Sequence, residues 1–103
     1  MKIVISNISP EDADEVARTL VEERAAACVN LLPVRSVYRW DGGIQVDSEV
    51  TLLIKVAADG VGRLVSRLRE LHPYALPEII VLDVNTGQSL ADYVHWVRSE
   101  TGD

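Results

Sequence analysis

Several features that assign a function from sequence alone are scarce in this chain of 103 residues. Its one cysteine, Cys28, excludes an internal disulfide, and its first residues lack the apolar segment and cleavage site of a signal peptide. We therefore expect a cytoplasmic protein. No apolar run approaches the roughly 20 residues of a membrane span, so no membrane partner is predicted.

Signatures of enzymes and of nucleic-acid-binding proteins are also missing. The chain has no glycine-rich phosphate loop, no Cys-x-x-Cys pair, no His-Glu-x-x-His helix and no serine nucleophile elbow. Its formal net charge is -6, and its one compact basic group, Arg63, Arg67 and Arg69, falls on a predicted helix, where a solvated face is the ordinary interpretation. We expect neither catalysis nor a nucleic-acid partner.

What is present is the balance of one globular domain over residues 1–103, with 48% hydrophobic and 25% charged residues. A strand over residues 2–5 precedes Ser9-Pro10, which is typical of a helix start, and an apolar stripe of helical spacing carries that helix to about Arg24. Residues 26–40 turn to a strand-like composition in which Pro33 indicates a bulge or a sheet edge.

The strongest local signal is a hairpin around Asp41-Gly42-Gly43, followed by strict alternation over residues 44–56. Two strands of roughly 12 residues would each span about 40 Å, whereas a usual strand has 5 to 6 residues. The apolar tip near Trp40 must then extend beyond a two-helix cover. Pairing with another copy would bury it; a freely projecting arm is the alternative.

The second half predicts a helix capped by Asp59 and ended by His72-Pro73, then a strand over residues 78–84. That strand is apolar enough to be central and covered on both faces. Ser89 and Asp92 predict a capping box for a last helix. The order β-α-β-β-α-β-α predicts an α+β, ferredoxin-like antiparallel sheet with two helices on one face and an extra C-terminal helix.

The polar and soft side chains that could carry chemistry are Cys28, His72, Tyr74, Glu78, Lys55, Trp40 and His95. Cys28 has the ordinary interpretation of a buried thiol, but beside imidazole and carboxylate it would suit Cu(II) or Zn(II). His72 complements a helix C-terminus, and its place before a proline predicts that it is exposed. Glu78 opens a buried strand and needs either a partner, such as Lys55 or a neighbouring subunit's arginine, or a ligand role. Both alternatives stay open.

Five blocks of sequence occur in order over nearly the whole chain: residues 20–30 (LVEERAAACVN), 37–42 (VYRWDG), 54–55 (IK), 72–74 (HPY) and 77–80 (PEII). They resemble the CutA family of divalent-cation tolerance proteins. The resemblance implies a ferredoxin-like domain in a homotrimer whose long hairpins pair between subunits. It also implies metal binding and a cytoplasmic role in tolerance to copper and other divalent ions.

The resemblance leaves His72, Glu78 and Cys28 as candidate metal residues. Positions where members offer a cysteine and a second histidine are Asn7 and Leu71, so we expect weak binding of Cu(II) or another divalent cation and no required cofactor.

By analogy of fold, such a trimer also resembles the P-II signalling proteins, which bind small effectors in clefts between subunits. Lys55, Tyr74 and Trp40 are the candidate residues for a cleft of that kind, which we expect to bind an organic anion near Lys55, Tyr74 and His72. Metal response and effector binding thus remain two hypotheses.

Overall fold

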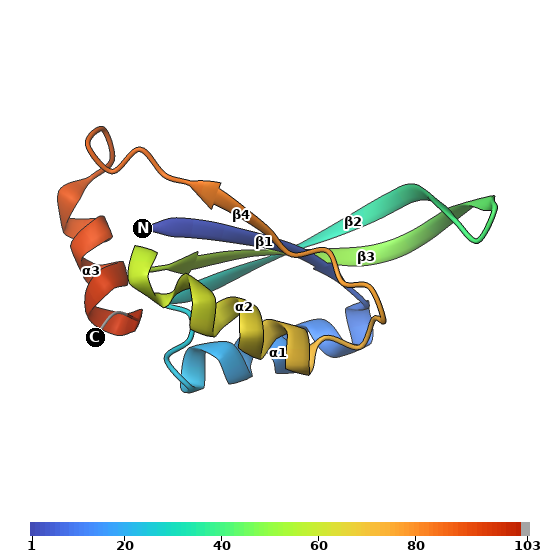
Figure 1. The fold of residues 1–103 in the computed structure, drawn as a ribbon, viewed down its shortest axis with the longest axis horizontal. Helices are drawn as coiled ribbons and strands as arrows, with labels where there is room; N and C mark the ends of the chain where they lie inside the picture. The colour runs from blue at the N-terminus through green and yellow to red at the C-terminus, as the bar shows by residue number, and fades with distance from the viewer. Residues whose placement is uncertain (102–103) are drawn as a thin grey trace.

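The structure, a computed structural model, describes residues 1–101 as a four-stranded antiparallel sheet of order β2-β3-β1-β4, with two helices on one face and a third at one end (Figure 1). The elements in chain order are β1 (Lys2–Ile8), α1 (Pro10–Glu22), β2 (Cys28–Trp40), β3 (Gly43–Val56), the 3₁₀ turn η1 (Ala58–Gly60), α2 (Val61–Leu71), β4 (Ile80–Asp83) and α3 (Ala91–Thr101). The predicted α+β order with an added last helix is confirmed. None of the helices within residues 1–101 has the length and apolar character needed to cross a bilayer.

The core lies between the sheet and the two helices below it. Alternate residues of β1 and β3 point toward α1 and α2, which present apolar stripes of helical spacing. The fully buried large side chains of this layer are Val4, Ile8, Leu20, Leu52, Ile54, Val56, Leu64 and Leu68. Each contributes roughly 1.5 to 3 kcal/mol by leaving water, so this layer stabilises the domain.

Hydrogen bonds and an ion pair join the end of α1 to α2. Arg67 grips the carboxylate of Glu23 through two nitrogens, each 2.8 Å from an oxygen, and its guanidinium lowers the pKa of Glu23. Arg63 donates to the carbonyl oxygens of Glu23 and Arg24. Arg24 has a φ of 59°, the left-handed conformation that often ends a helix. Arg63 and Arg67, which the sequence predicts to be a solvated face, therefore also connect α2 to the end of α1.

Strands β2 and β3 form the long hairpin that the alternation predicts, paired from Cys28 opposite Lys55 to the tip. The loop residues Asp41 and Gly42 have φ values of 52° and 76°, as a type I′ turn requires. Strand β2 lies at the sheet edge, which confirms the edge position that Pro33 indicates. A proline is tolerated there because its missing N–H can face the unpaired side of the strand.

The hairpin is longer than its cover. The 13 residues of α1 rise about 20 Å, whereas the 14 residues of β3 span about 46 Å. Figure 1 shows the hairpin continuing past α1 and α2. Its outer apolar side chains are therefore bare: Val37, Ile44 and Val46 are 65%, 59% and 58% exposed.

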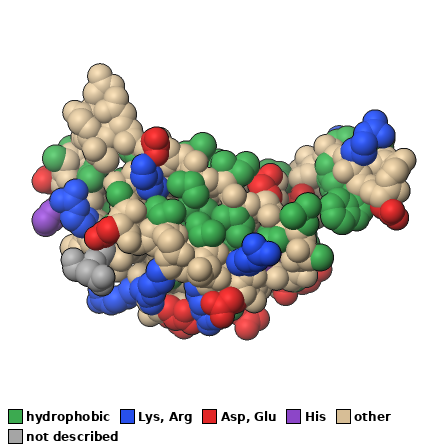
Figure 2. Space-filling model, viewed as in Figure 1, with side chains coloured by type: hydrophobic (Ala, Val, Ile, Leu, Met, Phe, Trp, Pro, Cys, Tyr) green, Lys and Arg blue, Asp and Glu red, His purple; other side chains and the backbone are tan. Residues whose placement is uncertain are grey.

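The sheet face turned away from the helices, which we call the open face, is apolar and uncovered. The register places Ile3 beside Leu82 and Ile5 beside Leu53 and Ile80 on this face. Leu82 and Ile80 are exposed, while the other three are half-buried. Figure 2 shows hydrophobic side chains gathered over the sheet, with charged ones concentrated along the side where α1 and α2 lie.

The prediction that residues 78–84 form a central strand covered on both faces is wrong. Strand β4 pairs only with β1 and lies at the sheet edge, with all four of its residues exposed. The apolar composition of a strand indicates that both of its faces are covered. It does not indicate whether the same chain or another copy covers them.

Two helix caps also differ from prediction. Asp59 lies inside η1, and α2 begins after Gly60 with no side-chain cap bond. Ser89 donates its hydroxyl to the carbonyl oxygen of Asn85 at 2.7 Å, and α3 begins only at Ala91. At α1, Ser9 does hold the predicted N-cap position, although its hydroxyl bonds to the Asp12 carboxylate.

Candidate functional site

An open groove of about 670 Å³ lies where the hairpin leaves the sheet, between β2, β3 and the loop after α2. We call it the hairpin groove. It is lined by Asn7, Ser36, Val37, Tyr38, Trp40, Asp47, Glu49, Tyr74, Ala75, Leu76 and Glu78. Its location follows from the chain path, because His72-Pro73 ends α2 and sends residues 74–78 past the hairpin root toward β4.

His72 anchors that loop to the end of β1. Its Nε2–H donates to the carbonyl oxygen of Asn7 at 2.9 Å, and its Nδ1 accepts from the backbone N–H of Tyr74 at 3.2 Å. The ring is 7% exposed and packs edge-on against the Tyr74 ring, with centroids 4.7 Å apart. Burial lowers the pKa of His72, against the opposing effect of the Asn7 bond. The predicted exposure of His72 is therefore wrong, and the fold uses its neutral form.

Two tyrosine–carboxylate pairs line the groove. Tyr74 donates its hydroxyl to Glu49 Oε2 at 2.8 Å, and Tyr38 donates to Asp47. Burial, reinforced by the Glu49 bond, raises the pKa of Tyr74, and the bond to Asp47 raises that of Tyr38. Both hydroxyls thus remain donors over the physiological range.

Sequence reasoning missed Tyr38, Asp47 and Glu49 as site residues. The signal was present, since residues separated by two on a strand share one face, and cross-strand pairing sets Ser36 opposite Asp47. The alternation was used to place the apolar residues of β3, whereas the polar residues between them form the groove wall.

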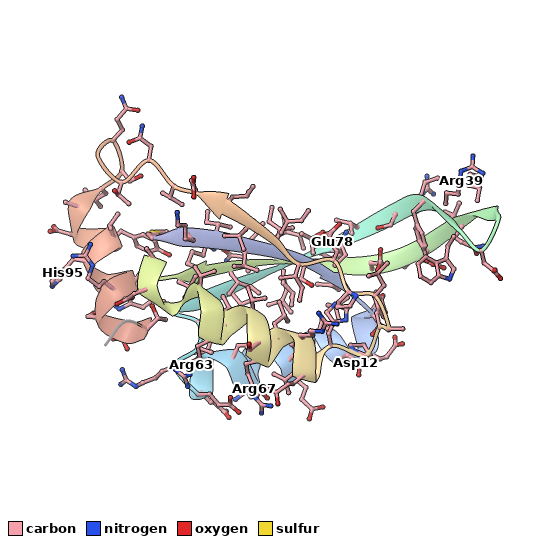
Figure 3. All side chains as sticks on the ribbon, in the orientation of Figure 1. Asp12, Arg39, Arg63, Arg67, Glu78 and His95 are labelled. Atoms are coloured by element: carbon pink, nitrogen blue, oxygen red, sulfur yellow. The ribbon has the colours of Figure 1, made fainter. Side chains whose placement is uncertain are left out.

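Trp40, Tyr74 and Glu78 come together in the groove, with His72 behind its wall. Figure 3 shows Glu78 beside the hairpin root and Arg39 near the tip. The carbonyl of Glu78 accepts the hydroxyl of buried Ser6 at 2.6 Å, while its side chain is exposed. Glu78 is thus held by its backbone, and its exposed side chain can meet a ligand at the groove.

Cys28 and Lys55 lie elsewhere. Lys55 Nζ bonds to the Asn30 side chain and lies 4.0 Å from Cys28 Sγ, so the predicted Lys55–Glu78 pair does not form within the chain. Cys28 is half-buried, which corrects its expected full burial.

The three candidate metal residues are not gathered in one place in this chain. Lys55, beside Cys28, pairs with Ile3, whereas His72 contacts Asn7, about 13 Å further along β1. Within residues 1–101, no three His, Cys, Asp or Glu side chains lie close enough to hold one metal ion.

Comparison with known proteins gives a consistent result. The family model described as CutA1 divalent ion tolerance protein matches residues 2–100. A divalent-cation tolerance protein CutA from Thermus thermophilus is 42% identical over 101 residues, covering 97% of this chain and 96% of the relative. Protein CutA from Mus musculus is 46% identical over 90 residues, 86% of this chain, which spans only 50% of that relative.

Among solved structures, the PII-like protein CutA from Nostoc sp. PCC 7120 in apo form superposes with a TM-score of 0.96 at 48% identity. The match covers 98% of this chain and 97% of that one. Fold, sequence blocks and family model agree over nearly the whole length. This chain therefore belongs to the CutA1 divalent ion tolerance protein family.

Proposed function

We propose that this protein acts in the response to divalent metal ions as a homotrimer that binds a small effector in the hairpin groove. The observation that carries the proposal is the groove itself, which combines aromatic side chains with polar groups from the hairpin and the loop after α2. The description of the Nostoc relative as PII-like fits this function. A cytoplasmic location, predicted from the sequence, goes with it and is tested by cell fractionation.

Assembly is supported by the surfaces that one chain leaves bare. The open face, the hairpin tip and the free edges of β2 and β4 are apolar or unpaired. Soluble proteins cover such edges, and a ring of three copies would cover them without leaving an end. The hairpin groove, bordered by the bare tip, would then lie next to a neighbouring copy.

A direct metal site is the second candidate, favoured by the family's description. His72, with Glu78 or a neighbouring subunit's carboxylate, remains the candidate ligand set, while Cys28, at the other end of β1, is a candidate only for a separate contact. Because His72 must give up a hydrogen bond to ligate, and because only neutral imidazole binds metal, binding of Cu(II) should be weak and should fall at acid pH.

Calorimetric titration separates the two candidates. Native protein is titrated with Cu(II) and with a panel of organic anions, neutral molecules and organic cations, alongside His72→Gln, Glu78→Gln and Cys28→Ala. Our proposal expects that at least one organic molecule of the panel binds saturably in the hairpin groove. Binding of Cu(II) alone, lost in His72→Gln, would instead establish the metal site.

A further inference from the structure

We infer that the hairpin groove selects an organic cation of the diamine or polyamine class, held between aromatic rings and separated carboxylates. The inference rests on the groove being an effector site, as proposed above, and names the chemistry of the effector.

The charge of the groove is of one sign. Asp47, Glu49 and Glu78 line it, and no Lys or Arg of the described chain does so. Carboxylates in a concave, partly desolvated surface attract cations and disfavour anions. An anionic effector would therefore meet repulsion from three carboxylates, with no Lys or Arg among the described lining residues to offset it.

Glu49 supplies an acceptor that the chain does not satisfy. The residue is only 8% exposed and lines the groove. Tyr74 donates to its Oε2, but no donor within residues 1–101 reaches Oε1. Every fully buried polar side-chain atom of the described residues has a partner, so Oε1 must face the open groove. Oε1 is therefore an accessible acceptor at the groove surface, where a charged N–H donor from a ligand can replace water.

The aromatic side chains favour the same kind of ligand. Trp40, Tyr38 and Tyr74 line the groove beside the carboxylates. A cation over a ring face is attracted by the ring quadrupole, most strongly for tryptophan, and methylene groups gain from the same apolar contact. A small inorganic ion would use neither surface.

The spacing of the carboxylates distinguishes a chain-like cation from a metal ion. Asp47 and Glu49 lie two residues apart on β3, about 7 Å, and Glu78 comes from the loop before β4. A metal ion needs its oxygen ligands at 2.0 to 2.6 Å, roughly, and no such group exists in the described chain. Two ammonium groups joined by methylenes match acids that are spread along a groove of about 670 Å³.

The test uses 1,4-diaminobutane as the probe and uncharged 1,4-butanediol as its isostere. Titration is followed by calorimetry and by Trp40 fluorescence in a Trp96→Phe background. We expect saturable diamine binding that weakens with salt, and no diol binding. Glu49→Gln and Glu78→Gln should each weaken the diamine by about tenfold or more, as loss of a charge-assisted hydrogen bond implies.

Glu15→Gln, which neutralises an exposed acid of α1 away from the groove, is the matched control and should bind as the native chain does. Since the Glu78 side chain is exposed, its variant keeps the test valid even where Glu49→Gln fails to fold. Equal binding of the diol, or equal weakening by Glu15→Gln, would overturn the inference. If another panel member binds the groove and the diamine does not, only the ligand class is wrong; if nothing binds there, the proposed effector function falls too.

Discussion

The two ends of the hairpin differ sharply although one alternating pattern runs through both. At the root, Leu52, Ile54 and Val56 are fully buried on the sheet face that α1 and α2 cover. At the tip, Ile44 and Val46 continue the same face of the same strand and are more than half exposed. The alternation of the strand assigns each side chain to one face of the sheet. Whether that face is buried depends on the helices packed against it, which are shorter than the strands. The bare tip therefore points to a partner.

The largest effect is expected at the root. Leu52→Ala should lower the free energy of unfolding by about 2 to 5 kcal/mol, because it leaves a cavity in the packed layer. Ile44→Ala, an aliphatic truncation on the same face of the tip, is the matched control and should cost less than about 1 kcal/mol within one protomer. Chemical denaturation at low concentration measures both. Equal losses would show that root and tip are covered alike.

The next effect separates protomer from assembly at the tip. Trp40 is 51% exposed in the single chain, so Trp40→Ala should cost little there and about 2 kcal/mol or more in the assembly if this residue is an interface anchor. Trp96, 42% exposed on α3, is the matched tryptophan control. In melting curves over a range of protein concentrations, the melting temperature of the native chain should rise with concentration. This rise should be lost in Trp40→Ala and kept in Trp96→Ala. An unchanged curve and mass would mean that the tip is solvated.

The smallest effect concerns the loop anchored where root and tip meet. Burial lowers the pKa of His72 in the folded state, so the unfolded chain takes up its proton first as the pH falls. The stability that neutral His72 contributes is complete above about pH 6.5, the pKa of histidine in the unfolded chain. It declines as the pH falls from there to the lowered pKa of the folded state. His72→Gln should flatten this slope in urea titrations between pH 7 and 5. His95→Gln, at an exposed position on α3, should retain it.

Much of the fold was predictable because it rests on local periodicity. The helical stripes, the two-residue turn at Asp41-Gly42 and the long alternation after it each require only neighbouring residues. The place of β4 was not predictable, because its apolar pattern is the same whether its own chain or another copy covers it. The predicted caps at Asp59 and Ser89 are wrong because a 3₁₀ turn that contains Asp59 precedes α2, and because α3 begins only at Ala91.

The candidate site was predictable only in part. Trp40, Tyr74 and Glu78 do line one groove, but the role of His72 depends on a carbonyl at Asn7, 65 residues away in sequence. No spacing rule shows such a contact. Cys28 was grouped with His72 by chemistry alone, and the sheet register places it at the other end of β1.

The central claim is that the tip, the open face and the groove belong to an interface between copies. Size exclusion coupled to light scattering tests it most directly, with native protein at micromolar concentration. The account predicts a single species of roughly three times the 11.4 kDa chain mass. A folded species of one chain mass under the same conditions would contradict it.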